Sequence, residues 1–290
     1  MSISVIDIIR VLIVVPTLLY ASYTDLRERR VADVVWLPAI LVGTLLALYE
    51  LSAADAQQLA PKFLANLLFL GLFGLLLYKG KVFYRADFKA FVVLAIILPT
   101  YPTIGQYPLI VPPDFTYRGV PTTIIGLTIL VNTALAGLFY PLVTAAKNIQ
   151  NRAFSIRHPL RSFTARKVTL TELHTIHGHI LPPTEGPRNP LHFFSDSIGG
   201  LNAEFISDYT EWTGAETFGD VEKINLEAFL RHNDEWDCTN IEEDKETLTN
   251  IKNSTEVWVT PGAPFMVPLT VGVLLSLIVG DLVYALVLAI

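Results

Sequence analysis

Long apolar runs separated by short charged loops constrain this chain more than any other feature. A helix needs about 20 mostly apolar residues to cross the hydrocarbon core of a bilayer, and fewer when flanking charged side chains reach the interface. A mean hydropathy of +0.47 is also too apolar for an ordinary soluble domain. We therefore predict an all-α polytopic membrane protein with six transmembrane helices. The predicted spans are residues 3–23, 33–51, 62–79, 87–100, 121–146 and 263–290.

The charged loops predict the orientation, because basic residues in short loops stay on the cytoplasmic side. Residues 52–61 hold no basic residue, and residues 100–120 hold only Arg118. Both termini are then expected outside. The alternate loops, expected in the cytoplasm, carry Arg27, Arg29, Arg30, Lys79, Lys81, Arg85 and Lys89.

A long polar stretch precedes the last predicted span. Residues 150–256 hold 10 Lys and Arg against 18 Asp and Glu. We expect three parts: a membrane domain at 1–146, a cytoplasmic α or α+β insert at 147–262, and a last transmembrane helix at 263–290.

Two carboxylates are expected at one depth of the membrane, with Asp25 at the end of the first span and Asp87 at the start of the fourth. Ionisable residues at membrane depth are costly, and they are therefore functional candidates. Two close carboxylates cannot both ionise cheaply, so one keeps a proton near neutral pH. Such a pair supplies a general base and a general acid. The alternative is that both residues are interfacial anchors or helix caps.

Three segments of the membrane portion carry recognisable motifs. Residues 23–33 place Asp25 before several basic residues and Asp33; residues 86–90 hold Asp87 and Lys89; residues 257–268 precede the last span. In these segments the chain resembles the type IV prepilin peptidase family, GxGD-type aspartyl membrane proteases. The likeness is strongest to its archaeal branch, the preflagellin (archaellin) and prepilin peptidases.

The resemblance implies an aspartic endopeptidase without a metal or cofactor. Such an enzyme removes the basic leader from type IV pilin-like precursors at the cytoplasmic boundary of the cell membrane. Asp25 and Asp87 would be catalytic, and Lys89 and Asp33 would bind substrate or tune a pKa. The expected partners are the precursor proteins and the lipid bilayer, with no nucleic acid. Methylation of the new terminus, which bacterial relatives also carry out, is not expected in a chain whose single cysteine is Cys238.

One departure from the family keeps an alternative open. The family has Gly-x-Gly before the second Asp, whereas this chain has Tyr84-Arg85-Ala86. Glycine permits backbone conformations that a bulky side chain resists. The alternative function is therefore a catalytically inactive membrane scaffold or binding protein of the same fold. A transporter is a weaker third hypothesis, because the charged residues noted here cluster at predicted helix ends and not at the midplane.

Several further polar residues have structural interpretations. Asp33 with Trp36 is typical of a helix N-cap beside an interfacial anchor, and Lys89 could extend to the interface instead of acting on Asp87. Asp281 is expected to meet a polar partner or to cap the last helix. The histidines of residues 174–179 fit a solvated surface better than a metal site; they are His174, His177 and His179.

Overall fold

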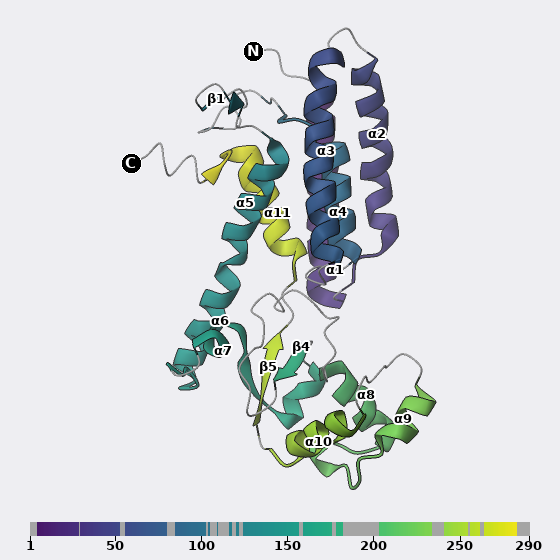
Figure 1. Cartoon of the computed structure of the whole chain (residues 1–290), viewed down its shortest axis with the longest axis vertical. Coiled ribbons are helices and arrows are strands. Elements are labelled where there is room, and N and C mark those ends of the chain that lie inside the picture. Colours follow the sequence, from purple (N-terminus) through teal and green to yellow (C-terminus); the bar gives the residue numbers. More distant parts are fainter. Residues whose placement is uncertain are drawn as a thin grey trace. The chain divides into compact units, whose positions relative to one another are not determined.

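The chain folds into two compact units, each with its own core. The helical unit comprises Met1–Phe139 and Pro264–Ile290, and the insert unit comprises Tyr140–Ala263. Figure 1 shows the elements of both units in a computed structural model. The structure describes residues 5–28, 30–52, 56–79, 85–102, 104, 109, 116–117, 120–121, 124–156, 159–175, 178–181, 203–233, 241–254, 256–261 and 264–282.

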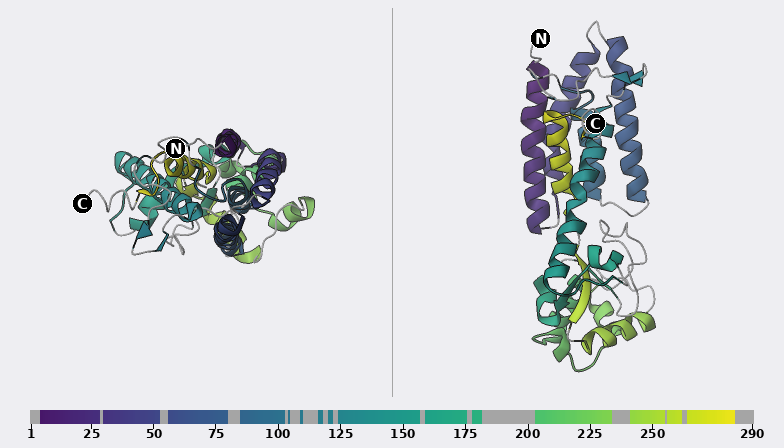
Figure 2. Two further views of the ribbon diagram at one scale, coloured as in Figure 1. Left: turned by 90° about the horizontal axis from the view of Figure 1, so that it is seen from above. Right: turned by 90° about the vertical axis from the view of Figure 1, so that its left-hand side faces the viewer.

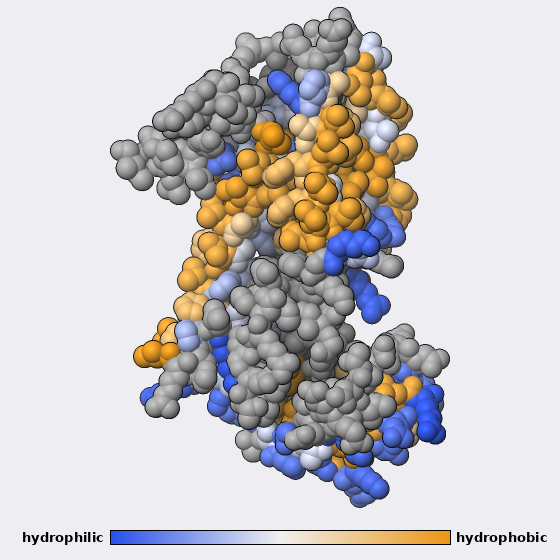
Figure 3. All heavy atoms as spheres, viewed as in Figure 1, coloured by the Kyte–Doolittle hydropathy of each residue, from blue (hydrophilic) through white to orange (hydrophobic). Residues whose placement is uncertain are grey.

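Four described stretches are long and apolar enough to cross a membrane: Val5–Arg27, Asp33–Leu51, Ala60–Lys79 and Ile125–Gln150. Apolar side chains cover the outer face of this part of the molecule in the view of Figure 3. Leucines at 41, 45 and 48 of one helix and at 64, 68 and 72 of another are each more than half exposed. An apolar surface of this extent fits lipid contact, as expected of a multi-pass membrane protein. The stretches correspond to α1 (Val5–Glu28), η1 (Asp33–Trp36) with α2 (Leu37–Leu51), α3 (Ala56–Lys79), and α5 (Ile125–Gly137) with α6 (Phe139–Gln150).

Two further apolar helices are shorter than the sequence predicts. The helices α4 (Arg85–Ile97) and α11 (Met266–Ile278) have 13 residues each. At 1.5 Å per residue each measures about 20 Å, against about 30 Å for the hydrocarbon core. Pro99 closely follows α4, and Gly280, with φ of 95°, follows α11. The helices described in the predicted fourth and sixth spans are therefore short, residues 283–290 lie outside the description, and the count of six spans is not confirmed.

The helix α4 packs against α2 and α3, and α11 packs against α1 and α5; Figure 2 shows α11, in yellow, beside these two helices. In α4 the side chains of Ala90, Phe91, Leu94, Ala95 and Ile97 have no exposed surface. A hydropathy pattern cannot distinguish burial against protein from burial in lipid, because both require apolar residues. The sequence pattern alone therefore does not reveal that α4 packs largely against protein.

Asn66 of α3 joins three helices at the end of α4. Its amide nitrogen donates to the carbonyl oxygen of Leu98 (2.8 Å), and its side-chain oxygen accepts from the backbone N–H of Gly126 (2.9 Å). The carbonyl at the end of α4 and the N–H at the start of α5 would otherwise be buried without these partners. One asparagine thus fixes α3, α4 and α5 to one another.

A very close contact joins α5 to α11. A Cβ atom added to Gly272 would lie 2.2 Å from Oγ1, 2.6 Å from N and 2.8 Å from Cα of Thr133. Two of these three atoms belong to the backbone, so α11 reaches this distance only with glycine at 272. Asn132 adds hydrogen bonds from its side-chain nitrogen to Oγ of Ser276 (3.0 Å) and to the carbonyl of Gly280 (2.9 Å).

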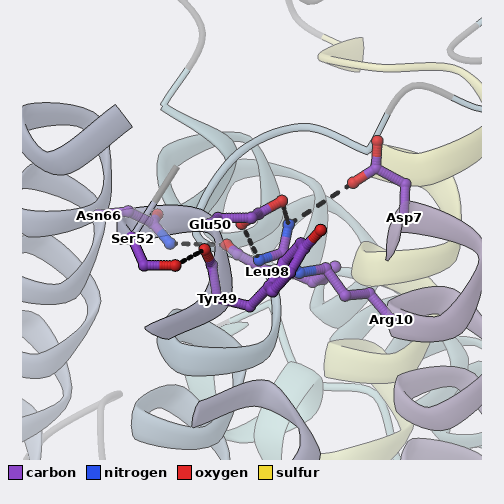
Figure 4. A network of polar contacts seen from close by, with 7 residues as sticks. All are labelled: Asp7, Arg10, Tyr49, Glu50, Ser52, Asn66 and Leu98. Atoms are coloured by element: carbon purple, nitrogen blue, oxygen red, sulfur yellow. Dashed lines mark hydrogen bonds and ion pairs between the residues drawn. The ribbon is translucent and has the colours of Figure 1, made fainter. Parts of the chain in front are cut away.

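Arg10 forms a buried ionic network between α1 and α2, shown in Figure 4. Its guanidinium is 1% exposed and lies 2.5 Å from Oε2 of Glu50 and 3.6 Å from Oδ1 of Asp7. Neither the arginine nor its partners were singled out from the sequence. The available signal was a basic residue several positions inside the first predicted span, which needs a counter-charge at the same depth.

The insert unit is built around an antiparallel three-stranded sheet of order β3-β5-β4. Val168 of β3 pairs with Val257 of β5, and Ile180 of β4 pairs with Val259 of β5. These side chains are buried with aromatic residues of the helices, so the described part of the insert is α+β. The strands are β3 (Arg166–Thr169), β4 (Gly178–Leu181) and β5 (Glu256–Pro261); the helices are α7 (Pro159–Thr164), η2 (Leu170–Thr175), α8 (Ala203–Thr213), η4 (Phe218–Asp220), α9 (Leu226–His232) and α10 (Ile241–Lys252). In the helical unit, β1 (Thr116–Tyr117) pairs with β2 (Val120–Pro121).

Candidate active site

Asp25 lies in the last turn of α1, on the face that packs against α11. Leu18, Ser22 and Asp25 are spaced by four and three residues, so they share one side of the helix. Each contacts α11: the Leu18 carbonyl accepts from Oγ1 of Thr270 (3.2 Å), and Oγ of Ser22 donates to the Met266 carbonyl (2.9 Å). The carboxylate oxygen Oδ2 of Asp25 accepts the backbone N–H of Met266 at 3.0 Å.

Asp87 lies in the first turn of α4 and is 4% exposed. Phe91 is one turn further along the same face of α4, and its ring lies 5.8 Å from that of Phe265, the N-cap residue of α11. The carboxyl groups of Asp25 and Asp87 are close enough to interact electrostatically. The end of α1, the start of α4 and the start of α11 therefore meet, and they bring the two carboxylates into one site.

Lys89 and Asp33 form a separate ion pair beside this site. Two residues along a helix differ by about 200° in direction, so Lys89 projects away from Asp87. Its ammonium group pairs with the carboxylate of Asp33 on η1. The side chains of the lysine and aspartate are 39% and 78% exposed, so solvent reaches both.

The predicted roles of Asp33 as a helix N-cap and of Trp36 as an interfacial anchor are wrong. The N-cap of η1 is Ala32, and no side chain caps the helix there. Asp33 follows as the first residue of η1 and turns to Lys89 instead. Trp36 is 2% exposed, so it packs inside the helical unit and does not anchor the chain at an interface.

The altered motif before Asp87 is described in part. Arg85 and Ala86 begin the regular helix α4, a conformation that does not require glycine. Among the described residues, Arg152 alone is a non-glycine with positive φ. Tyr84 lies outside the described residues. The loss of a glycine at position 86 thus needs no change of backbone.

The other residues noted in the sequence lie elsewhere or outside the description. Asp281 is 6% exposed, and its charge acts on Tyr101. His177 and the side chains of His174 and His179 lie outside the described residues. In the described part of the chain, no group of three His, Cys, Asp or Glu residues is placed to hold a metal ion.

Two family models together match nearly the whole length of the chain. Residues 12–142 match the model of the type IV leader peptidase family. Residues 157–282 match the model of the archaeal peptidase A24 C-terminus, type II. A search of curated proteins found no match. The first matched region contains Asp25, Asp33, Asp87 and Lys89, and the second contains the first turn of α11.

Proposed function

We propose that this chain, which belongs to the archaeal branch of the type IV leader peptidase family, is a membrane-embedded aspartic endopeptidase. Its substrates are type IV pilin-like precursors of the preflagellin and prepilin class, and it removes their basic leader. The observation that carries the proposal is the convergence of Asp25 and the buried Asp87 at the meeting point of three helix ends. Family membership alone indicates a protease, and the carboxylate pair supplies the chemistry.

The pair can hydrolyse a peptide bond with one shared proton. The ionised carboxylate takes a proton from water, whose oxygen attacks the carbonyl carbon. The protonated partner gives its proton to the carbonyl oxygen, forming a tetrahedral diol. The first carboxyl then passes its proton to the amide nitrogen, the C–N bond breaks, and a diol hydroxyl returns a proton to the partner. A new carboxylic acid and a new amine result, and water is consumed.

The basic residues of the loops support a cytoplasmic position for this end of the helical unit. We propose that α4 and α11 complete six membrane passages together with their flanking residues, that both termini lie outside, and that residues 147–262 lie in the cytoplasm. A basic leader followed by an apolar helix would present its junction at this depth. The single cysteine of the chain, Cys238 in the insert, offers a direct test.

Labelling of that cysteine tests the orientation. A membrane-impermeant thiol reagent applied to intact cells should leave Cys238 unmodified and should modify it after permeabilisation. The matched control is Ser52→Cys in a Cys238→Ser background, because Ser52 is exposed in the turn after α2 and is expected outside. Labelling of Cys238 in intact cells would overturn the orientation.

Cleavage of a pilin-like precursor by the full chain in liposomes tests the activity. The wild type should cut between leader and helix, and Asp25→Asn and Asp87→Asn should each lower kcat by at least about 10³-fold, because each removes one partner of the acid and base pair. Asp208→Asn on α8 is the matched control and should cleave as the wild type does. Cleavage that survives both active-site substitutions would refute the proposal. Failure of the wild type on every precursor offered would favour the inactive scaffold that Tyr84 first raised.

A further inference from the structure

The start of α11 donates to one of the two carboxylates. Met266 is the first residue of α11, and its N–H has no acceptor within the helix. That N–H points at Oδ2 of Asp25 (3.0 Å). The amino end of a helix carries a partial positive charge, so it favours a negative group in this position. A backbone N–H also bonds a carboxylate more strongly than a neutral carboxyl.

Three buried hydroxyl contacts hold this end of α11 on α1. Oγ of Ser22 donates to the carbonyl of Met266 (2.9 Å) and meets Oγ1 of Thr270 (2.7 Å), and Thr270 donates to the carbonyl of Leu18 (3.2 Å). Ser22 is 8% exposed and Thr270 4%. We call these contacts the α1–α11 clasp. Because the clasp and Asp25 share one face of α1, it fixes the distance between the carboxylate and the donor.

Asp87 has a different environment. It is 4% exposed, whereas Asp25 is only partly buried, and burial away from water disfavours charge. Two described cations of the neighbouring helices have partners of their own: Arg27 of α1 donates to the hydroxyl of Tyr23 (2.9 Å), and Lys89 of α4 pairs with Asp33 of η1. The sequence of α11 contains no charged residue. The side chains of Glu28, Arg29 and Arg85 lie outside the description.

We infer that the first turn of α11 is a positioning element that holds Asp25 in its ionised form and so assigns the roles within the pair. This inference rests on the proposed peptidase function. Asp25 takes the proton of the attacking water, and Asp87 gives its proton to the carbonyl oxygen of the scissile bond. Met266 and the α1–α11 clasp act through Asp25 and do not touch the substrate.

An amide-to-ester change at position 266 tests the inference most directly. Incorporation of the hydroxy-acid analogue of methionine removes the donor N–H and keeps the side chain. Substitution by proline is less suitable, because Phe265 is helical and a following proline disfavours that conformation. The measurement is kcat/KM for precursor cleavage as a function of pH, with the full chain in liposomes.

The acid limb of that profile should move to higher pH by about one unit, because loss of a hydrogen bond to a charged group disfavours the charged form. The sign follows from the role of Asp25: activity needs its ionised form, which becomes harder to reach without the donor. The alkaline limb, which reports the proton on Asp87, should stay in place. An unmoved acid limb, or a shift confined to the alkaline limb, would overturn the assignment.

The clasp gives a second test by ordinary mutagenesis. Thr270→Val deletes the hydroxyl at nearly constant volume and should shift the acid limb in the same direction. Thr270→Ser keeps the hydroxyl and loses only the methyl group, so it should keep the wild-type profile. A Thr270→Val profile identical to the wild type would contradict the positioning role.

The same assay separates this inference from the proposed function. If Asp25→Asn and Asp87→Asn both cleave, the peptidase proposal fails, and the assignment of roles fails with it. If both variants are inactive while the ester at 266 leaves the pH profile unchanged, the peptidase proposal stands and only the positioning role is rejected.

Discussion

The contact between Gly272 and Thr133 predicts that one added methyl group, as in Gly272→Ala, will force α5 and α11 apart. Gly272→Ala would place Cβ 2.2 Å from a side-chain oxygen and within 2.8 Å of two backbone atoms of Thr133. Rotation of the threonine can relieve only the first contact. Overpacking of this kind costs about 3 kcal/mol at the upper end, and the better helix propensity of alanine returns about 1 kcal/mol.

The expected net loss is therefore about 2 kcal/mol, or roughly a 30-fold rise in the unfolding equilibrium constant. Gly71→Ala on α3 is the matched control, because a Cβ there meets no atom within 4 Å. It should leave stability unchanged or raise it by up to about 1 kcal/mol. Unfolding by SDS in mixed micelles, followed by circular dichroism, measures both variants.

The double variant Gly272→Ala with Thr133→Ala sharpens the test. It removes the oxygen at 2.2 Å but leaves the backbone nitrogen at 2.6 Å and Cα at 2.8 Å. We expect most of the destabilisation to remain. Equal stability of Gly272→Ala and Gly71→Ala would refute the reasoning, and full recovery in the double variant would place the strain in the hydroxyl alone.

Three further substitutions test other polar contacts. Glu50→Gln should cost about 3 kcal/mol in SDS unfolding, because it strips the charge partner from the buried guanidinium of Arg10, whereas replacing both residues by leucine should cost much less. Asn66→Leu should cost about 2 kcal/mol in the same assay, because the N–H of Gly126 and a carbonyl lose their buried partner; wild-type stability would contradict this. Burial raises the pKa of Tyr209, so the unfolded chain ionises first. The stabilisation that Tyr209 provides is complete below about pH 10, and it falls above that pH by up to about 1.4 kcal/mol per pH unit. The thermal stability of the insert should therefore fall more steeply above that pH in the wild type than in Tyr209→Phe. Equal dependence of stability on pH in the two proteins would contradict this prediction.

The sequence allows the helical class and the long apolar helices to be predicted, because hydropathy and loop charge are local properties. The lengths of α4 and α11 could not be predicted in the same way. Ala90, Phe91 and Leu94 are as apolar as lipid-facing residues, and nothing in the pattern reveals that protein surrounds them. The end of α11 depends on a backbone conformation at Gly280, which hydropathy does not register.

The candidate site, like the fold, could be predicted from the sequence only in part. The chain order and loop charges are enough to infer that Asp25 and Asp87 lie at one end of the bundle. The contact with Met266 left no trace in the sequence, because a backbone N–H is present at nearly every residue. The pair of Arg10 and Glu50 is 40 positions apart, so finding it requires the register between two antiparallel helices. The partner of Lys89 was missed because Asp33 was interpreted as a cap.

The buried face of α4 restricts which changes the gene can accumulate. Leu45 and Leu68, each 58% exposed, can be exchanged for other apolar residues at little cost, since lipid adapts to any shape. Ala90 and Ala95 have no exposed surface, so a larger side chain at either position has no room without displacing a neighbouring helix. Substitutions in this protein should therefore be more frequent on the lipid-facing helices than on the buried face of the helix that carries Asp87.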